Sequence, residues 1–489
     1  MFSIAVLGAL VIVGAPAGHA QEAPDISRDE FRLVWQRTEA PVANGDTARS
    51  WLWGPEPRTG GINERYLDSP DQQREVQYFD KGRMEVNDPS ADPTDPWFVT
   101  SGLLTRELIS GEIQIGDDAF LNTGGGAAIH VAGDHMTPFP QYRHLEVIVD
   151  EGSLDLTGSV ASQEFTPDGM IEVSDDPPAD DGAELVHYVT YLGPDGETVG
   201  YNIPRAFWDY LNAPGTVYDD NNTAGTADPL FSWVFVMGLP IADPFWVEVP
   251  VGGETRWVLI QPFERRVLTY TPANSPEWQV EMGNIGQHYR DWRSQYFHDA
   301  PAGGDTEFYG LHDGGFWRFG TSHGADERWN AMGFTDSFVP GSTLYAREEH
   351  KLDGLRVTYW SAGEDGLYLH GWDALDSNRD LQDMVVYSPA VHVLPSEYKE
   401  ESLRTTTTAI SMGHEPERNV IETTVEQEQL VSTPAGLFRT WRVSASGFDN
   451  GEIDHRLGER LWFKPELGIV QWLSSDFSAF LLNSNVLEE

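Results

Sequence analysis

An internal repeat is the feature that most constrains how this 489-residue chain can fold. The segment Ser50–Pro55 reads SWLWGP and the segment Phe235–Pro240 reads FVMGLP, so each copy carries a glycine closely followed by a proline. In both copies a phenylalanine, Phe79 or Phe263, lies 25 residues after that glycine, and the copies are offset by 184 residues. Such self-similarity predicts that one supersecondary unit is built twice in the N-terminal part of the chain.

Each copy predicts a tight turn followed by a half-buried strand. The turns are expected at Gly54 with Pro55 and at Gly238 with Pro240. The alternating pattern around the two phenylalanines directs both rings inward. The charged neighbours of these rings are expected to pair locally at the surface, Asp80 with Lys81 and Glu264 with Arg265.

Aromatic side chains near the two turns have two interpretations. They build the small core of each repeat, or the exposed ones form stacking faces for a sugar or wall polymer, because an aromatic ring covers apolar sugar surface at little entropic cost. Both interpretations stay open from sequence. The candidate ligand-binding residues are Trp53, Phe79, Trp97, Trp208, Phe263 and Trp278.

The composition favours strands and turns over helices. The chain has 17 Trp, 17 Tyr and 23 Phe together with 48 Gly and 31 Pro, and few amphipathic runs of helical length. We therefore expect a mainly β protein with some helix. The predicted organisation is a repeat-bearing region at 29–298 with copies at about 31–108 and 207–293, an inserted β-layer at 109–206, a linker at 299–305 and a C-terminal β-domain at 306–487.

Short apolar runs mark individual strands. In the insert these runs are His144–Val149 and Leu185–Tyr191. In the C-terminal domain they are Leu355–Trp360, Gly366–His370, Met384–Tyr387, Phe438–Val443 and Arg460–Phe463.

The N-terminus predicts export. Residues Phe2–Gly18 are almost all apolar or small and end in Gly18-His19-Ala20, which is typical of a signal peptide over 1–20 with cleavage after Ala20. A membrane anchor is the rival interpretation, although glycines and a proline interrupt the run. No later stretch is apolar enough to span a membrane. The absence of cysteine excludes a disulfide framework in an extracytoplasmic protein.

The charge excludes several partners. The chain has 78 Asp and Glu against 31 Lys and Arg, a formal net charge of −47, and these acids are scattered through all regions. Such a field repels nucleic acid and anionic lipid surfaces. We expect a solvated acidic shell without bound metal or cofactor. The calcium alternative is the loop with Asp376, Asn378 and Asp380, which lacks the glycine and the bidentate Glu of a calcium loop.

One enzyme motif has a plausible local context. Gly320–Gly324 reads GTSHG, follows the strand-like Phe316–Phe319 and precedes an expected helix at Ala325–Met332, as a nucleophile elbow requires. Its partners would be Asp376 with His414 or His455. Against it, no alternation of strands and helices precedes Ser322. Catalysis at Ser322 is therefore the alternative and not the leading interpretation.

The second copy resembles the LGFP repeat of bacterial cell-wall-associated proteins. The matching runs are Gly238–Pro240, Phe263–Pro272 and Val280–Ile285, preceded by a short aromatic helix at Phe207–Leu211. The first copy departs from the pattern, because no residue separates Gly54 from Pro55 and because Asp80 replaces Glu. The wider segment Phe31–Trp292 resembles uncharacterised exported proteins of Chloroflexi-type bacteria. The resemblance implies a surface or wall location and supplies no ligand.

The C-terminal region also carries a resemblance. Tyr309–Trp317, Thr433–Phe438 and Leu461–Val470 are similar to exported β-domains of unknown function that are related to envelope lipoprotein carriers. The implied fold is a curved antiparallel sheet whose concave face packs on a helix or holds an apolar ligand. Together these features predict a non-catalytic binding or structural protein of the cell surface, possible partners being a glycan or wall polymer, and leave the oligomeric state open. The alternative is a secreted serine hydrolase.

Overall fold

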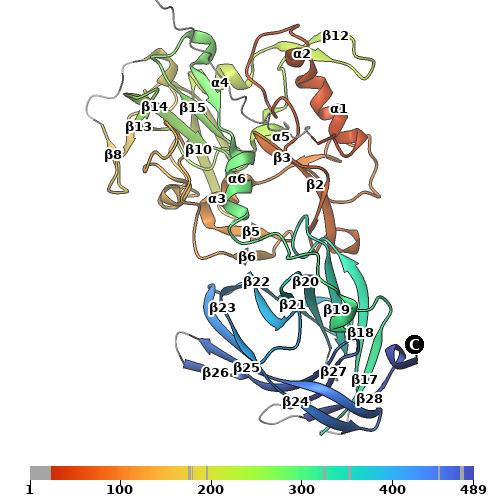
Figure 1. The fold of residues 1–489 in the computed structure, drawn as a ribbon. Helices are drawn as coiled ribbons and strands as arrows, with labels where there is room; N and C mark the ends of the chain where they lie inside the picture. The colour runs from red at the N-terminus through yellow and green to blue at the C-terminus, as the bar shows by residue number, and fades with distance from the viewer. Residues whose placement is uncertain are drawn as a thin grey trace, which may run out of the picture.

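The computed structural model describes residues 24–174, 178, 180–193, 196–322, 326–350, 354–449, 452–473 and 478–488. An N-terminal part of small sheets and short helices lies against a C-terminal part of long antiparallel strands (Figure 1). The prediction of a mainly β fold is confirmed. The predicted signal peptide at 1–20 lies outside the described residues.

The first copy folds as a small antiparallel sheet followed by a helix. Its strands pair in the order β1-β2-β3-β4. Two short helices precede this sheet, and one follows it. The elements are α1 (Asp29–Thr38), α2 (Ala40–Ala43), β1 (Ile62–Arg65), β2 (Gln73–Phe79), β3 (Gly82–Val86), β4 (Thr100–Ser101) and α3 (Leu104–Ser110).

The second copy has the same order of elements, with α5 (Trp233–Met237) before its turn. Its strands pair as β13-β14-β15-β16 and lead into a helix. The elements are β13 (Phe245–Val251), β14 (Glu254–Pro262), β15 (Val267–Tyr270), β16 (Val280–Met282) and α6 (Ile285–Arg293).

The two turns bond to their strands in corresponding ways. The amide of Lys81 donates to the carbonyl of Trp53 at 2.9 Å, and the amide of Arg265 donates to that of Met237 at 2.9 Å. Phe79 forms a bridge with Pro57, as Phe263 does with Pro240. The proline that corresponds to Pro240 is therefore Pro57, whereas Pro55 is exposed. The first copy therefore does have the turn proline of the repeat pattern, but this proline lies further from Gly54 than Pro240 lies from Gly238.

The helices of the two copies are exchanged. In α6 the amide of Gln287 donates to the carbonyl of Asp80, at 3.1 Å, and in α3 the amide of Arg106 donates to the carbonyl of Glu264, at 3.3 Å. Each helix therefore contacts the hairpin of the other copy, at corresponding positions. This reciprocal contact joins the copies much as a two-fold interface joins two subunits.

The local charge pairs expected at these hairpins are not formed. Asp80 bonds to Arg58 at 2.6 Å, and Glu264 lies 3.5 Å from Arg106 of α3. The ammonium of Lys81 donates to the carbonyl oxygen of Met282 and to the side chain of Asn284. The prediction was wrong because the exchanged helices and the turns bring these partners closer than the sequence neighbours are.

The insert and the first part of the second copy supply further strands and a helix. The elements of the insert are β5 (Glu112–Gln114), β6 (Phe120–Asn122), β7 (Gln163–Phe165), β8 (Ile171–Val173), β9 (Leu185–Leu192) and β10 (Thr198–Pro204). They are followed by α4 (Arg205–Leu211), β11 (Gly215–Tyr218) and β12 (Ala224–Ala227). Strand β7 extends the sheet of the second copy through a parallel bridge between Glu164 and Trp246. The predicted strand at Leu185–Tyr191 is confirmed as β9.

The predicted strand at His144–Val149 is wrong. Residues Tyr142–Val147 form a 3-10 helix instead. Its first turn is closed locally, because the imidazole of His144 accepts from the amide of Gln141 at 3.1 Å. Leu145 is fully buried on the inner side of this turn. The hydrogen bond to His144 and the burial of Leu145 thus stabilise a helical turn here in place of a paired strand.

The C-terminal part is one antiparallel ladder. Each strand pairs with its sequence neighbour, and β28 pairs back onto β17. A curved antiparallel sheet was predicted, and the strand signals of this region all fall within strands. The strands are β17 (Phe316–Thr321), β18 (Asp326–Thr335), β19 (Leu344–His350), β20 (Leu355–Gly363), β21 (Gly366–Leu375), β22 (Leu381–Pro395), β23 (Glu401–Ser411), β24 (Glu417–Thr433), β25 (Gly436–Asp449), β26 (Glu452–Lys464), β27 (Gly468–Leu473) and β28 (Ser478–Ser484).

The expected helix at Ala325–Met332 is wrong, since β18 covers all of its described residues, 326–332. β18 pairs on one side with β17 and on the other with β19, so ladder pairing on both sides outweighs helical propensity. The GTSHG segment therefore connects two antiparallel strands. A nucleophile elbow requires a strand that leads into a helix, and that context is absent here.

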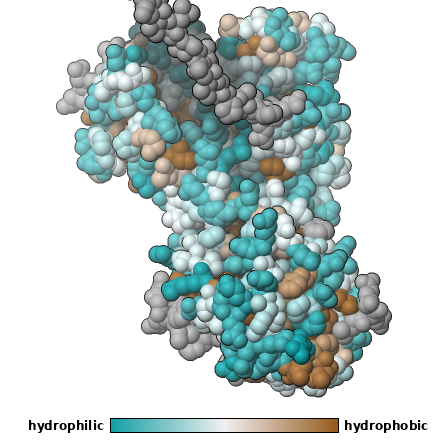
Figure 2. All heavy atoms as spheres, viewed as in Figure 1, coloured by the Kyte–Doolittle hydropathy of each residue, from teal (hydrophilic) through white to brown (hydrophobic). Residues whose placement is uncertain are grey.

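The two parts of the molecule share one hydrophobic core. Val76 and Trp292 of the N-terminal part belong to the same buried cluster as Val357 and Met384 of the curved sheet. A buried ion pair reinforces this contact, because Arg65 Nη2 lies 2.7 Å from Asp373 Oδ2. Rigid attachment of the two parts follows. Figure 2 shows hydrophilic residues spread over both of them, with smaller apolar patches scattered among these residues and one at the lower end of the C-terminal part.

A network of buried charges lies within the first copy, between its sheet and helices α3 and α6. Glu64 lies 3.0 Å from Arg293 and 3.5 Å from Arg83, all within the protein interior. Burial by itself would raise the pKa of Glu64, but the neighbouring arginines lower that pKa to about 2. The other members of the network are Arg74, Tyr78, Glu85, Glu107 and Tyr289.

Candidate functional site

Two neighbouring pockets of the N-terminal part form the candidate site. We call the larger one, of about 910 Å³, the acidic pocket, and the smaller one, of about 450 Å³, the aromatic pocket. They share the side chains of Leu52, Leu230 and Phe231 as a common wall. Together we call them the groove.

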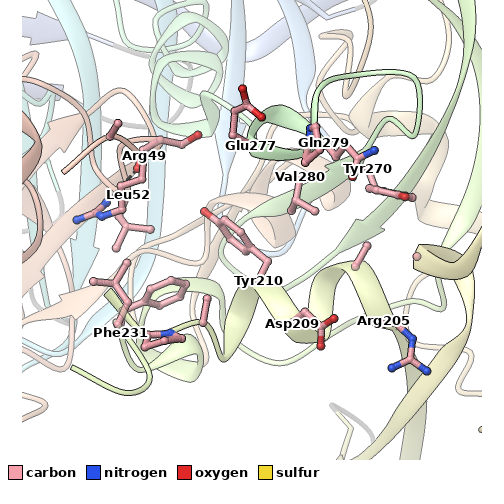
Figure 3. A pocket seen from close by; sticks show the side chains of 18 of the residues that line it. Arg49, Leu52, Arg205, Asp209, Tyr210, Phe231, Tyr270, Glu277, Gln279 and Val280 are labelled. Atoms are coloured by element: carbon pink, nitrogen blue, oxygen red, sulfur yellow. Dashed lines mark hydrogen bonds between the residues drawn. The ribbon is translucent and has the colours of Figure 1, made fainter. Parts of the chain in front are cut away.

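The acidic pocket lies between α4 and the end of the second copy. Helix α4 contributes Asp209 and Tyr210, and the segment after β15 contributes Glu277 (Figure 3). Asp209 and Glu277 are both exposed, and no ion pair among the described residues involves either of them. Their carboxylates can therefore accept hydrogen bonds from a hydroxylated ligand.

Tyr210 lies near the middle of the acidic pocket, between Leu52 and Val280 (Figure 3). Its ring meets that of Phe231 edge to face, with 6.3 Å between centroids. Burial raises the pKa of Tyr210 to about 12, although Arg49 opposes the shift. The phenol is therefore neutral and can donate or accept a hydrogen bond at any physiological pH.

Two other charged groups of this pocket are already paired. The hydroxyl of Tyr270 donates to Asp180 at 2.5 Å, and burial followed by this hydrogen bond raises the pKa of Tyr270. Arg205 lies 2.5 Å from Glu184. These pairs fix the wall of the pocket and leave Asp181, Asp209 and Glu277 as its exposed acids without an ion pair among the described residues.

The aromatic pocket displays Trp97, whose side chain is 52 % exposed. Phe235 lies beside it with 6.2 Å between ring centroids, and Trp53 lies below Phe235 at 6.1 Å. The resulting surface is a layered aromatic wall in which only the outermost ring is open to solvent.

The loop that carries Trp97 is held by its own carboxylates. Asp88 accepts from the amide of Ser90 at 2.8 Å, and Asp95 accepts from the amide of Trp97 at 2.8 Å. Asp92 makes the same bond to Thr94. The hydrogen bond from the Ser90 hydroxyl lowers the pKa of Asp88. These turns preorganise the exposed indole.

The structure separates the predicted aromatic residues into three groups. Trp53, Phe79 and Phe263 are buried and belong to the core of the repeats. Trp97 is exposed in the groove, and Trp278, 48 % exposed, neighbours Glu277 at its rim. Trp208 stacks on His187 at 3.8 Å and does not line the groove.

The two predicted turn glycines both adopt positive φ. The φ angle is +134° at Gly54 and +74° at Gly238. A Cβ at Gly54 would contact Asp80, and one at Gly238 would crowd Glu264. Each turn therefore needs glycine both for its backbone conformation and for the acid that approaches it.

The candidate catalytic residues are not brought together among the residues described. The hydroxyl of Ser322 accepts from the amide of Ser478 at 3.1 Å. His414 is exposed in the turn between β23 and β24, and Asp376 lies in the turn between β21 and β22. The side chain of His455 lies outside the described residues. The structure instead pairs Ser361 with His370 at 2.9 Å, both buried in the curved sheet.

The candidate calcium loop uses its first acid for backbone bonding. Asp376 Oδ1 accepts from the amides of Asn378 and Asp380, at 2.8 and 2.9 Å. Across the described ranges, no group of three or more His, Asp or Glu is arranged to hold a metal ion. The carboxylates of this loop therefore behave as turn-forming residues.

Sequence reasoning missed most of the acidic pocket. Arg49, Asp209, Tyr210, Tyr270 and Glu277 come from separate segments, and no motif joins them. The one available signal was the aromatic helix at Phe207–Leu211. Tyr210 follows Trp208 by two residues on this helix, so the two side chains point in different directions, and only Tyr210 lines the pocket.

Comparisons with known proteins leave the function open. No family model matches the chain, and no curated protein matches it. Two solved structures are similar to parts of it. One is a putative lipoprotein from Parabacteroides distasonis, which is 8 % identical, has a TM-score of 0.20, and is matched over 38 % of this chain and 100 % of its own. The other is a putative exported protein with a YmcC-like fold from Bacteroides fragilis, which is 10 % identical, has a TM-score of 0.18, and is matched over 36 % of this chain and 98 % of its own. At these TM-scores neither similarity carries an argument about function. Among the described helices, none has the length and apolar character of a membrane span.

Proposed function

We propose that this chain is an exported, non-catalytic protein that binds a glycan or wall polymer of the cell surface along the groove. The observation that carries the proposal is the exposed Trp97 on a preorganised loop, next to a pocket with unpaired carboxylates. Aromatic faces stack on the apolar faces of sugar rings, and carboxylates accept hydrogen bonds from sugar hydroxyls. The apposition of both groups in one groove suits a carbohydrate chain.

The charge of the protein narrows the class of polymer. With a net charge of −47, the chain repels phosphate-rich or uronate-rich polymers over long distances. The acids at the groove, Asp209 and Glu277, have the same effect locally. A neutral or amine-bearing glycan is therefore the favoured class.

The resemblance to LGFP repeats supports a location at the wall, and the signal-like N-terminus supports export. Binding is favoured over hydrolysis because the GTSHG segment connects two antiparallel strands and the Ser322 hydroxyl bonds to a backbone amide. A polymer-binding role also explains an extended groove in place of a single deep cleft, since two pockets with a common wall can hold consecutive sugar units.

A pull-down with insoluble cell-wall polysaccharide, followed by calorimetry with soluble chitin and cellulose oligosaccharides, tests the proposal. Replacing Trp97 by Ala removes the stacking face and is expected to weaken binding about 10-fold, the loss typical of an exposed aromatic anchor. Tyr398→Ala, at an exposed aromatic of the C-terminal domain, is the matched control and is expected to bind like the unmodified protein.

Two results would contradict the proposal. One is equal glycan binding by the Trp97→Ala variant and the unmodified protein. The other is tighter binding of an anionic wall polymer than of a neutral one of the same length.

A further inference from the structure

The curved sheet encloses a second cavity, of about 450 Å³, remote in sequence from the groove. Its walls come from strands β19 to β24 together with β26 and β27. We call it the inner cavity. It is unusual in combining aromatic and charged side chains. The aromatic ones are Trp360, Trp372, Tyr387 and Trp472, and the charged ones are Arg347, Glu349, Arg356 and Glu417.

Strand alternation separates this lining from the hydrophobic core. On β20 the side chains of Arg356 and Trp360 line the inner cavity, whereas Val357 and Tyr359 belong to the core shared with the N-terminal part. The inner face is not purely polar, because the cavity is also lined by Leu369, Val385, Ile421, Leu461 and Ile469. What distinguishes it from the core is the presence of charged side chains beside the apolar ones.

A short segment fills only one end of the interior. The 3-10 helix Glu307–Tyr309 places Phe308 against Trp441 and Phe463, in a cluster that also includes Trp360. Phe308 of this helical turn therefore packs on the concave face of the sheet, and the inner cavity lies beside this contact.

One ion pair inside the cavity is satisfied. Arg347 lies 3.3 Å from Glu349, and its guanidinium carbon is 4.9 Å from the centre of the Trp360 ring. Both side chains are largely buried, and burial lowers the pKa of Arg347 while Glu349 opposes this shift. A buried pair of this kind is seldom more stable than aliphatic packing.

Arg356 is the second cation of the cavity. Its guanidinium carbon lies 4.7 Å from the centre of the Trp372 ring. No ion pair among the described residues involves Arg356, and the remaining acid, Glu417, is exposed at the rim. The interior therefore presents one cation, held on an indole, that lacks a carboxylate partner.

We propose that the inner cavity binds a small planar aromatic molecule that carries one carboxylate. The indoles provide faces for the ring, and the guanidinium of Arg356 provides a two-pronged donor for the carboxylate. The cavity has the size of an ordinary small-molecule site, which spans roughly 300–1,000 Å³.

Other ligand classes fit the lining less well. A long aliphatic chain would remove water from Arg356 and from the pair of Arg347 with Glu349 without offering them a hydrogen bond. A cation would be repelled by Arg356.

Calorimetric titration of the full-length protein with 2-naphthoate tests the proposal. Binding is expected for the unmodified protein and at least 10-fold weaker for Arg356→Gln and Trp372→Leu. Octanoate, with the same charge, and 2-naphthalenemethanol, with the same ring, are expected to bind at least 10-fold more weakly than 2-naphthoate. Arg404→Gln, an exposed arginine of β23, is the matched control.

Separate controls test whether each variant is folded and whether the groove contributes to naphthoate binding. Arg356→Lys keeps the cation, and thermal unfolding of each variant shows whether the sheet is intact. The Trp97→Ala variant is expected to retain full naphthoate binding, so failure of this proposal is distinguishable from failure of glycan binding. Undetectable naphthoate binding at millimolar concentration, unchanged affinity in a folded Arg356→Gln variant, or equal affinity for octanoate would each overturn it.

Discussion

Arg65 of β1 and Asp373 of β21 form a buried ion pair that joins the two parts of the molecule, with 2.7 Å between Nη2 and Oδ2. The phenol of Tyr359 donates to the same carboxylate oxygen at 2.6 Å. The carboxylate therefore has two donors from opposite sides of the contact. Removing the arginine is expected to lower the free energy of unfolding strongly, because it would leave the buried carboxylate of Asp373 without a cation.

Breaking this pair is the first prediction. Arg65→Ala is expected to destabilise the protein by about 3–5 kcal/mol, because it leaves Asp373 buried without its cation. Arg32→Ala, in an exposed pair with Asp29, is the control and should cost less than about 1 kcal/mol. Urea unfolding followed by tryptophan fluorescence measures both. Equal effects of the two variants would show that the buried contact does not hold the parts together.

The second prediction concerns the pH dependence of Glu64. Its pKa is lowered in the folded protein from 4.5 to about 2, so its contribution to stability is full above pH 4.5 and disappears as the pH falls toward 2. Glu64→Gln should therefore destabilise the protein most near neutral pH, by several kcal/mol. The difference from the unmodified protein should shrink as the solution is acidified. Unfolding at a series of pH values measures it.

A matched control isolates the buried carboxylate from the general acidity of the chain. Glu254, in an exposed pair with Arg256, should give a small and nearly pH-independent effect when replaced by Gln. A constant difference between Glu64→Gln and the unmodified protein from pH 7 to pH 3 would contradict the assigned pKa.

The third prediction tests the exchanged helices. Gly286 of α6 lies directly against the first hairpin, and a Cβ there would overlap the carbonyl oxygen of Phe79. Gly286→Ala is expected to destabilise the protein by about 1–3 kcal/mol through overpacking. Gly283→Ala is the control, because a Cβ at Gly283 has open space within 4 Å. Thermal unfolding compares the two, and equal melting temperatures would argue against tight helix exchange.

The repeat was the part of the fold most accessible from sequence. Equal spacing from glycine to phenylalanine identified the turn and the inward ring of each copy, because a bend and a buried aromatic are local requirements. The exchange of α3 and α6 between the copies could not be predicted from the sequence. It depends on contacts such as that between Gln287 and Asp80, which are about 200 residues apart and carry no local pattern.

Local propensity also failed where pairing or capping decided the structure. Ala325–Met332 was expected to be a helix, but β18 is held by neighbours on both sides. His144–Val149 was expected to be a strand, but the bond from the Gln141 amide to His144 closes a helical turn. Among the candidate site residues, Trp97 is exposed and Trp53 is buried. Exposure depends on the assembled fold, so the sequence around each tryptophan does not reveal this difference.

The last prediction concerns the acid surplus, which we expect to behave as a diffuse charged shell. Turn-forming acids such as Asp88, Asp92 and Asp376 accept hydrogen bonds from backbone amides, which engages these carboxylates without a metal. Their mutual repulsion, summed over a net charge of −47, opposes the compact state. Salt weakens this repulsion, because the screening length falls from about 10 Å at 0.1 M to about 3 Å at 1 M. The melting temperature should therefore rise smoothly with sodium chloride. Submillimolar calcium, with a chelator as its control, should add nothing beyond its ionic strength, and a large stabilisation that the chelator abolishes would instead establish a dedicated calcium site.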